Sequence, residues 1–235
     1  MKLNTNSNTY ILAYASLLVI AVAFVLAYFS QALKPIQDKN VALDKKKQII
    51  AALNIRDVND NQVEEYYNKL VEADEIINEK NEVLSAGKPG GENDGFKLNG
   101  GDFKAGKLAL FVCNVDGQKK YVMPVYGMGL WGGISGYIAI NADKETIYGV
   151  YFNHEGETAG LGAEIKDNQK WQQQFYGKHL FADGNQDAVA LSVCKKVDNP
   201  ATQVDGVSGA TLTCDGVTRM IHEGLGKYLV FLKDK

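Results

Sequence analysis

Cysteine and histidine are scarce in this chain of 235 residues, which contains three of each. The cysteines, Cys113, Cys194 and Cys214, form no C-x-x-C pair, and no histidine stands at the spacing of a zinc site. The sequence therefore gives no basis for a disulfide framework or a metal centre.

An excess of positive charge is also lacking. The chain has 25 basic and 28 acidic residues, and without Lys2, which precedes the first apolar stretch, the balance is 24 minus 28, or −4. Domains that bind nucleic acid normally present a basic surface. We therefore expect no nucleic-acid partner.

Charge is absent altogether between Tyr10 and Leu33. The apolar run of residues 11–29 is close to the roughly 20 residues that an α-helix needs to cross a bilayer. Tyr28 suits the headgroup boundary, and Lys34-Pro35 is expected to end the span. The sequence predicts a short tail at residues 1–9 and a membrane anchor, in contact with lipid, at residues 10–33.

A cleaved signal peptide is the alternative, because Ser30-Gln31-Ala32 resembles a small-x-small cleavage site. A signal core usually has about 7 to 15 apolar residues after a basic start. This run is longer, and only Lys2 precedes it, so we expect a retained anchor.

The lysines around the span leave its orientation open. Lys2 lies on one side, whereas Lys34, Lys39 and the trio Lys45-Lys46-Lys47 lie on the other. By the positive-inside rule this count places the large domain in the cytoplasm. The trio could instead be the solvated face of a helix.

Residues 34–85 are expected to form a helical connector and the start of the globular domain. Residues 41–53 have the pattern of an amphipathic helix, and Asn61 is placed to cap a second helix, with Glu64 three residues later. The segment from Ser85 to Asp102 is rich in turn-forming residues and predicts a mobile surface loop.

Residues 86–235 are expected to form the main domain, with short strands followed by helices. The predicted strands are residues 108–115, 118–126, 136–140, 146–152 and 188–195, and the predicted helices are residues 167–176 and 212–232. Asp116-Gly117 suits a two-residue hairpin, and Gly226 could break the last helix. The expected fold is α+β, a largely antiparallel sheet flanked by helices, with one N-terminal transmembrane helix.

Two motifs in this domain have weak chemical signals. Gly127 to Gly132 spells G-x-G-x-x-G, but a β-type run follows it rather than the helix that a dinucleotide fingerprint opens. His154 begins a glycine-rich segment that could approach a flat ligand. No nucleophile or acidic partner can be assembled around His154 from spacing, so we assign no catalytic residue.

A third motif, residues 207–211, leads from a turn into the last predicted helix. Ser208 or Thr211 could cap that helix, whose free N–H groups would suit an anion. A capped helix without any ligand satisfies the same pattern, so this motif alone does not establish phosphate binding.

Four segments resemble one family in the same order along the chain. Asp205-Gly-Val-Ser-Gly-Ala-Thr211 matches the flavinylation pattern D-x-x-[ST]-G-A-[ST] at every fixed place. Residues 154–162 resemble the family's E-T-P-G-L-G segment, with Ala159 in place of proline. Residues 129–139 and 171–178 complete the match. The chain thus resembles the C subunit of the sodium-translocating NADH:quinone oxidoreductases, a family with a covalent FMN-binding domain.

The resemblance implies that a separate flavin transferase joins FMN to Thr211 through a phosphoester. The protein would pass electrons between cofactors of neighbouring subunits of a complex that pumps sodium and reduces ubiquinone with NADH. It would not be active alone. The domain would lie on the periplasmic side of the bacterial inner membrane, held there by a single span.

The same resemblance assigns the site residues. Ser208, Gly209 and Ala210 would shape the approach to Thr211, with Thr213 as a phosphate hydrogen-bond donor. The residues expected to line the isoalloxazine ring are Glu157, Thr158, Gly160, Leu161 and Trp131. Lys195 or Lys196 could stabilise a reduced, anionic ring, although solvated lysines at a strand end are the simpler interpretation.

Three alternatives remain at this point. The related G subunit of the Rnf ion-translocating complex shares the flavin motif and the anchor, but residues 129–131 and 171–178 favour the quinone-linked family. A membrane-anchored binding module without redox function would use the motif only as a helix cap. An independent flavin reductase would oxidise NADH by itself, and the sequence indicates no nicotinamide site.

Overall fold

The computed structural model describes residues 7–183 and 185–234. The chain divides into two compact units, Met1–Asp44 and Lys45–Lys235. Helix α1 (Asn8–Ala52) occupies most of the first unit and supplies the first residues of the second.

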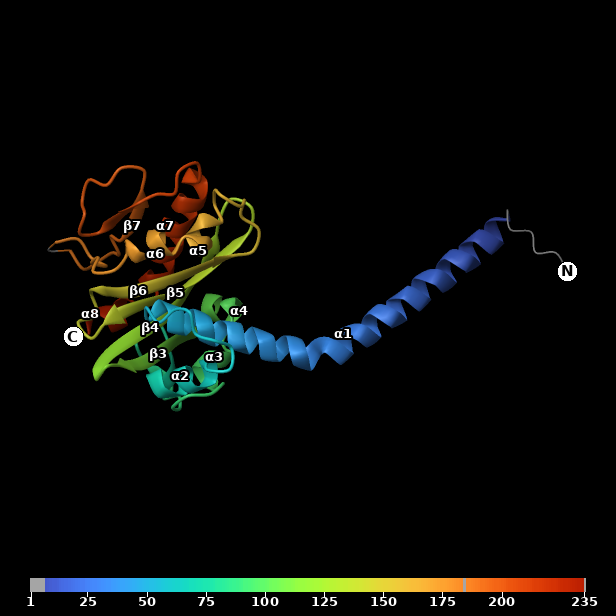
Figure 1. Cartoon of the computed structure of the whole chain (residues 1–235), viewed down its shortest axis with the longest axis horizontal. Helices are drawn as coiled ribbons and strands as arrows, with labels where there is room; N and C mark the ends of the chain where they lie inside the picture. The colour runs from blue at the N-terminus through green and yellow to red at the C-terminus, as the bar shows by residue number, and fades with distance from the viewer. Residues whose placement is uncertain (1–6, 184, 235) are drawn as a thin grey trace. The chain divides into compact units, whose positions relative to one another are not determined.

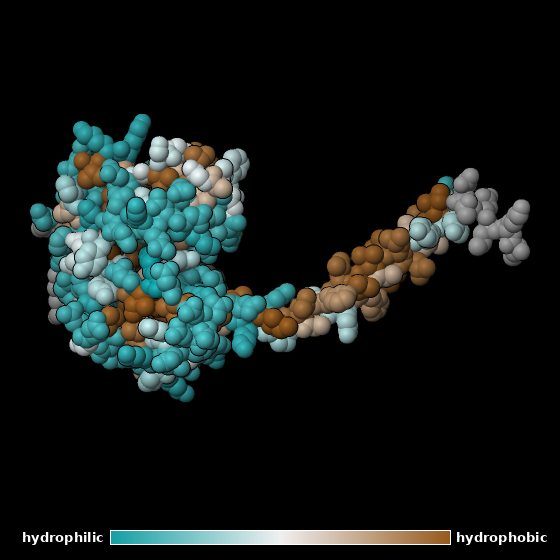
Figure 2. Space-filling model, viewed as in Figure 1, coloured by the Kyte–Doolittle hydropathy of each residue, from teal (hydrophilic) through white to brown (hydrophobic). Residues whose placement is uncertain are grey.

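The apolar part of α1 is exposed along its length. Phe24 and Tyr28 are 75% and 71% exposed, and Figure 2 shows hydrophobic residues covering this helix, whereas the globular unit presents a mainly hydrophilic face. Within the described residues, one helix is long and apolar enough to cross a membrane, by length and composition. Pro35 does not break the helix as expected, because α1 continues through it. Proline removes one backbone hydrogen bond and crowds the preceding turn, which here does not end the helix.

The last turns of α1 are built into the globular unit. Lys46 is 2% exposed, and its Nζ lies 2.7 Å from a carboxylate oxygen of Glu64 and 3.5 Å from one of Glu92. Lys45 donates to the carbonyl oxygens of Phe96 and Leu98. We call these residues, Lys45, Lys46, Glu64, Glu92 and Phe96, the Lys46 junction. The interpretation of the lysine trio as a solvated helix face is therefore wrong for Lys46.

Six antiparallel strands form the main sheet, in the order β2-β1-β3-β4-β5-β6 (Figure 1). Their bounds are β1 (Val71–Ile77), β2 (Val83–Ser85), β3 (Leu108–Val115), β4 (Gln118–Met128), β5 (Gly133–Asn141) and β6 (Ile147–His154). Asp116 and Gly117 both have positive φ, 51° and 79°, as a two-residue hairpin between right-twisted strands requires. The predicted α+β class, antiparallel sheet and hairpin are confirmed.

The region before β3 differs from its prediction. Strand β1 was not predicted, and α2 (Val63–Leu70) begins after Gln62 with no side-chain cap, so Asn61 is not its cap. The predicted loop at 85–102 instead contains α3 (Asp94–Lys97) and part of α4 (Gly100–Lys104). Asp74 of β1 holds this segment, because its carboxylate accepts the backbone N–H groups of Lys88 and Phe96.

The helices that cover the other part of the sheet come later in the chain. They are α5 (Glu164–Asp167), α6 (Gln169–Gln173), α7 (Thr211–Gly226) and α8 (Leu229–Lys233). Asn168 interrupts the single helix predicted at 167–176 and caps α6 with its side chain. The break after Gly226 is confirmed. A short parallel pair, β7 (Ser192–Cys194) and β8 (Gln203–Asp205), precedes α7, and β7 is shorter than predicted.

Helix α7 packs directly on the sheet through a shared hydrophobic core. A Cβ added to Gly127 of β4 would lie 2.7 Å from Cβ of Met220, so the glycine allows the close approach. Val217, Met220, Ile221 and Leu225 are buried in this core. The packing fixes the first turn of α7, with Thr211, relative to the ends of β4, β5 and β6.

Candidate cofactor site around Thr211

Thr211 is the first residue of α7, and its side chain is exposed. The residue before it, Ala210, occupies the cap position, and no described side chain forms a cap hydrogen bond to this helix. The expected cap by Ser208 or Thr211 is therefore wrong, because Thr211 already lies inside the helix. The first N–H groups of a helix lack partners within it and favour an anion, so an anionic group on Thr211 would be well placed.

The loop before Thr211 has a defined path. Gly209 has φ of +77°, a conformation that favours glycine, and its Cα faces Cδ2 of Leu161, which would lie 2.8 Å from a Cβ at this position. Val207 donates its N–H to Sγ of Cys214 and accepts the N–H of Ala210. The structure thus brings the 205–211 motif against the segment that begins at His154.

A buried carboxylate joins this segment to α7 and to the β4–β5 turn. Glu157 is 8% exposed; its Oε2 accepts the hydroxyl proton of Thr213 at 2.6 Å, and its Oε1 accepts the N–H of Trp131 at 2.9 Å. A Cβ on Gly129 or Gly162 would lie 2.4 Å from one of these oxygens. We call Gly129, Trp131, Glu157, Gly162 and Thr213 the Glu157 cluster.

The Glu157 cluster keeps its carboxylate charged. Burial raises the pKa of Glu157, but hydrogen bonds from the Thr213 hydroxyl and from the N–H groups of Trp131 and Leu130 lower it more, so the net pKa lies below 4.5. His154 Nδ1 accepts the N–H of Glu157 at 3.2 Å. This contact uses one ring nitrogen of His154 within its own segment.

The structure places Thr213 and Glu157 differently from what their predicted roles would require. Thr213 is 1% exposed and gives its hydroxyl proton to Glu157, so that proton is already used and does not face Thr211. Glu157 lies beneath the surface and supports the site rather than presenting its side chain to a ring. Lys195 and Lys196 are exposed after β7, and Lys196 lies 3.7 Å from Asp198.

The surface beside Thr211 carries large apolar side chains that are unusually exposed. Trp131 is 69% exposed, Leu161 is 42% exposed and Leu212 is 58% exposed. Thr158 and Gly160 are also exposed. A flat aromatic ligand held at Thr211 would cover such a surface, so the residues present fit a flavin whose phosphate is at the helix terminus.

Helix α6 and the turn after it contribute two residues that sequence reasoning did not place in the site. Nε1 of Trp171 donates to the carbonyl oxygen of Asp205 at 2.7 Å, and Oε1 of Gln174 accepts the N–H of Asp205 at 3.1 Å. The family-like segment at 171–178 was the available signal, but its spacing gave no role. A surface pocket lies between α6 and the loop, lined by Trp171, Gln174 and Ser208.

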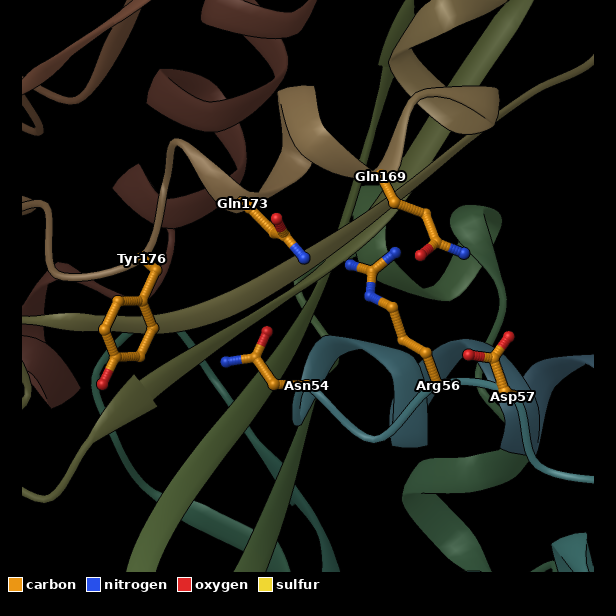
Figure 3. Close-up of a pocket in the computed structure, with 6 residues that line it drawn as sticks. All are labelled: Asn54, Arg56, Asp57, Gln169, Gln173 and Tyr176. Atoms are coloured by element: carbon orange, nitrogen blue, oxygen red, sulfur yellow. The ribbon is translucent and has the colours of Figure 1, made fainter.

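A second, polar pocket lies on another side of α6 and contains none of the predicted site residues. Figure 3 shows Arg56 extending toward the helix from which Gln169 and Gln173 project. Among residues 7–183 and 185–234, no group of three or more His, Cys, Asp and Glu side chains could hold a metal ion.

Comparisons with known proteins place these features in a family. Residues 129–226 match the model of the FMN-binding domain. The C subunit of the Na+-translocating NADH-quinone reductase of Haemophilus ducreyi is 31% identical over 99% of this chain and 97% of its own length. The corresponding subunit of Pseudomonas aeruginosa is 29% identical over 95% and 94%.

Solved structures agree. The crystal structure of the C subunit from Parabacteroides distasonis superposes with a TM-score of 0.78 at 36% identity, covering 86% of this chain and 98% of that one. The protein from Shewanella oneidensis gives 0.65 at 27% identity, covering 83% and 100%. Because the similarity extends over nearly the whole length of both chains, the protein belongs to the C-subunit family of the Na+-translocating NADH-quinone reductases.

Proposed function

We propose that this protein is the electron-carrying subunit of a membrane Na+-pumping NADH:quinone oxidoreductase and holds FMN through a phosphoester to Thr211. The observation that carries the proposal is the position of Thr211. It is exposed in the first turn of α7, at the end of the D-G-V-S-G-A-T motif and beside an exposed apolar surface. The membership of the chain in the C-subunit family supports the same function.

The attachment requires an activated flavin donor. Oγ of Thr211 would attack a phosphorus of a flavin dinucleotide, forming an O–P bond while the phosphoanhydride bond of the donor breaks. The hydroxyl proton passes to a base of the flavin transferase, and the nucleotide monophosphate leaves. This chain offers no general base at Thr211 by the contacts described, which supports a separate transferase.

When bound, FMN supplies one- and two-electron chemistry, and the chain supplies position and electrostatics. Gly209 and Ala210 set the path to Thr211, and Ser208 stands exposed beside it. The exposed groups that would contact the ring are Trp131, Thr158, Gly160 and Leu161. Glu157 and Thr213 hold the three segments together beneath them. A tether suits a carrier that must donate electrons repeatedly without losing its cofactor.

In this proposal residues 10–33 span the bacterial inner membrane once, residues 34–85 form the helical connector and the start of the globular domain, and residues 86–235 carry the flavin on the periplasmic side. The lysine trio no longer opposes this orientation strongly. Lys45, Lys46 and Lys47 each have partners within the globular unit, so the fold itself accounts for them. Protease digestion of intact spheroplasts tests this placement, and protection of the domain that is lost when the membrane is opened would overturn it.

The central experiment is to produce the full chain together with a flavin transferase and to measure the mass of the tryptic peptide 197–219. We expect an increment of one FMN minus water on Thr211, with a yellow colour that survives acid. An unmodified peptide and a colourless protein would overturn the proposal and favour an anchored binding module. NADH oxidation by the purified chain alone would favour a free flavin reductase.

A further inference from the structure

We propose that α6 positions the flavin-attachment loop: Trp171 and Gln174 hold the backbone of Asp205 and thereby set how Thr211 is presented for modification. The inference rests on the proposed function and adds residues to it. Trp171 and Gln174 are three positions apart, so they share one side of the helical turn. Together they bind both backbone polar groups of a single residue.

Asp205 is the point at which the loop leaves regular structure. It is the last residue of β8 and is aligned with Cys194 of β7. Immediately after it, Gly206 donates its N–H to the carbonyl oxygen of Cys194 at 2.8 Å, and Val207 donates to Sγ of Cys214 at 3.2 Å. The side of the loop nearest β8 is therefore fixed by α6, β7 and α7 together, whereas Ser208, Gly209 and Thr211 are exposed.

Helix α6 is itself braced, so it can serve as a fixed support. The ring of Trp171 is packed against Phe152 and Phe175 with centroids 5.9 and 5.3 Å away. The side-chain amide of Gln172 donates to the carbonyl oxygens of Ile165 and Lys166. These contacts fix the helix from its buried side and leave the indole N–H directed at Asp205.

A further contact braces α6 from the segment that follows α1. Nη2 of Arg56 donates to Oε1 of Gln172 at 2.8 Å and to the carbonyl oxygen of Val150 at 2.9 Å. Figure 3 shows this arginine reaching from its loop toward α6. A continuous set of hydrogen bonds thus runs from edge strand β6, through Arg56 and α6, to the start of the flavin motif.

Asp205 is exposed, so its backbone polar groups do not need partners within the protein. Water could satisfy its N–H and carbonyl oxygen equally well in a purely structural turn. Two side chains of one helical turn bind them instead. This arrangement reduces the number of conformations that the motif samples and leaves the Thr211 hydroxyl in one place for an incoming transferase.

The test compares rates of modification by purified flavin transferase and FAD, followed as the mass of the full chain in detergent. Trp171→Phe keeps the buried aromatic ring and removes the N–H, and Gln174→Met removes the acceptor. We expect each to slow labelling at least about fivefold, which corresponds to about 1 kcal/mol in activation free energy. Gln173→Met, on the exposed neighbouring position, should label at the wild-type rate.

A second measurement separates positioning from loss of stability. Amide hydrogen exchange of the unmodified chain should accelerate at Asp205 and Gly206 in Trp171→Phe and Gln174→Met, but not in Gln173→Met. Ile77→Val, in the core far from α6 in sequence, serves as a control of lowered stability and should label normally.

Wild-type labelling rates in both Trp171→Phe and Gln174→Met would overturn the inference while leaving the proposed function intact. Equal slowing in Ile77→Val at matched melting temperature would also overturn it. A wild-type chain that accepts no flavin would overturn the proposed function and this inference with it.

Discussion

The Lys46 junction and the Glu157 cluster both bury a charged side chain, but they balance it differently. Lys46 is matched by two carboxylates that are themselves half exposed, and it lies over the rings of Tyr67 and Phe96, at 5.5 and 5.7 Å. Glu157 is matched by a hydroxyl group and backbone N–H groups, which carry no net charge. The first arrangement opposes its buried charge with opposite charges nearer the surface, whereas the second retains an unopposed negative charge beneath the surface.

The two regions also differ in how far the apolar side chains around them are exposed. Around the Lys46 junction the aromatic side chains Tyr67 and Phe96 are buried. Around the Glu157 cluster, Trp131, Leu161 and Leu212 remain exposed next to Thr211. At the Lys46 junction, folding alone buries these aromatic side chains. The cluster leaves apolar surface that folding alone does not cover, as expected where a ligand binds.

At the Glu157 cluster, the largest expected effect is on flavin attachment, and the free energy of unfolding should change little. Thr211→Ala should abolish the mass increment, because the acceptor oxygen is gone. Its free energy of unfolding should stay within about 0.5 kcal/mol of the wild-type value, since Thr211 is exposed and makes no cap. Peptide mass and thermal melting measure the two quantities, and Thr211→Ser is the control that keeps an acceptor.

If the mass increment persisted in Thr211→Ala, the ester would have to lie on another residue. The contrast drawn between the Glu157 cluster and the Lys46 junction would then fail. Thr213 is a poor substitute in the folded chain, because it is 1% exposed and bonded to Glu157. A modified Thr213 would therefore contradict both the attachment site and the geometry of the Glu157 cluster.

At the Lys46 junction the largest effect should fall on stability. Glu64→Gln with Glu92→Gln leaves a buried ammonium without a carboxylate and should cost about 3 kcal/mol. Lys46→Met removes the buried charge and leaves two carboxylates that can be hydrated, so its cost should be below about 1.5 kcal/mol. Denaturation of the full chain in detergent would measure both. The reverse order would show that the ion pairs do not control this region.

Glu157→Gln should have an intermediate effect, about 2 kcal/mol at pH 7, because hydrogen bonds to a charged acceptor become weaker or are lost. The folded-state pKa of Glu157 is lowered, so its contribution is present above pH 4.5 and is lost as the pH falls through the folded pKa. The stability difference between wild type and Glu157→Gln should therefore shrink below pH 4.5.

Glu155→Gln, an exposed neighbour, is the matched control and should cost less stability than Glu157→Gln at pH 7. In flavin-loaded protein, Glu157→Gln should also raise the midpoint potential, because a nearby negative charge disfavours added electrons. An unchanged potential would mean that the charge beneath the surface is not felt by the flavin.

The smallest effect on stability should come from Trp131→Ala, within about 0.5 kcal/mol, because the side chain is 69% exposed. The same change should alter the visible circular dichroism of bound flavin, since the ring would lose an aromatic neighbour. Tyr176→Ala removes another aromatic side chain, 64% exposed, and should leave that spectrum unchanged. Identical spectra in both variants would remove Trp131 from the flavin surface.

Local sequence patterns predicted those parts of the fold that local interactions determine. Strand β3 and the Asp116-Gly117 hairpin follow from alternation and turn chemistry, and both were predicted. Strand β1 was missed because it follows α2 without a turn signal and contains a buried aspartate. Asp74 is acceptable there only because backbone N–H groups of Lys88 and Phe96 bind it, and no local pattern reveals that.

The site was predictable to a similar extent. The motif singled out Thr211 as a candidate, and the 154–162 segment singled out Glu157. The contacts that join them span 26 residues between Trp131 and Glu157 and 56 between Glu157 and Thr213, beyond the reach of any periodicity. Thr213 therefore looked available for a phosphate, and only the packing of α7 shows its proton directed at Glu157.

These long spans also impose an order of events during biogenesis. A nascent chain that has not yet reached residue 211 contains Glu157 and Trp131 but lacks Thr213, so the carboxylate has no hydroxyl partner and α7 does not cover β4. Thr211 is synthesised after the sheet, the 154–162 segment and α6, but before the rest of α7, whose packing on β4 fixes its position. In the proposed function, attachment of FMN at Thr211 by a transferase that reads the folded site therefore follows the synthesis of α7, and a chain stalled before α7 is no substrate.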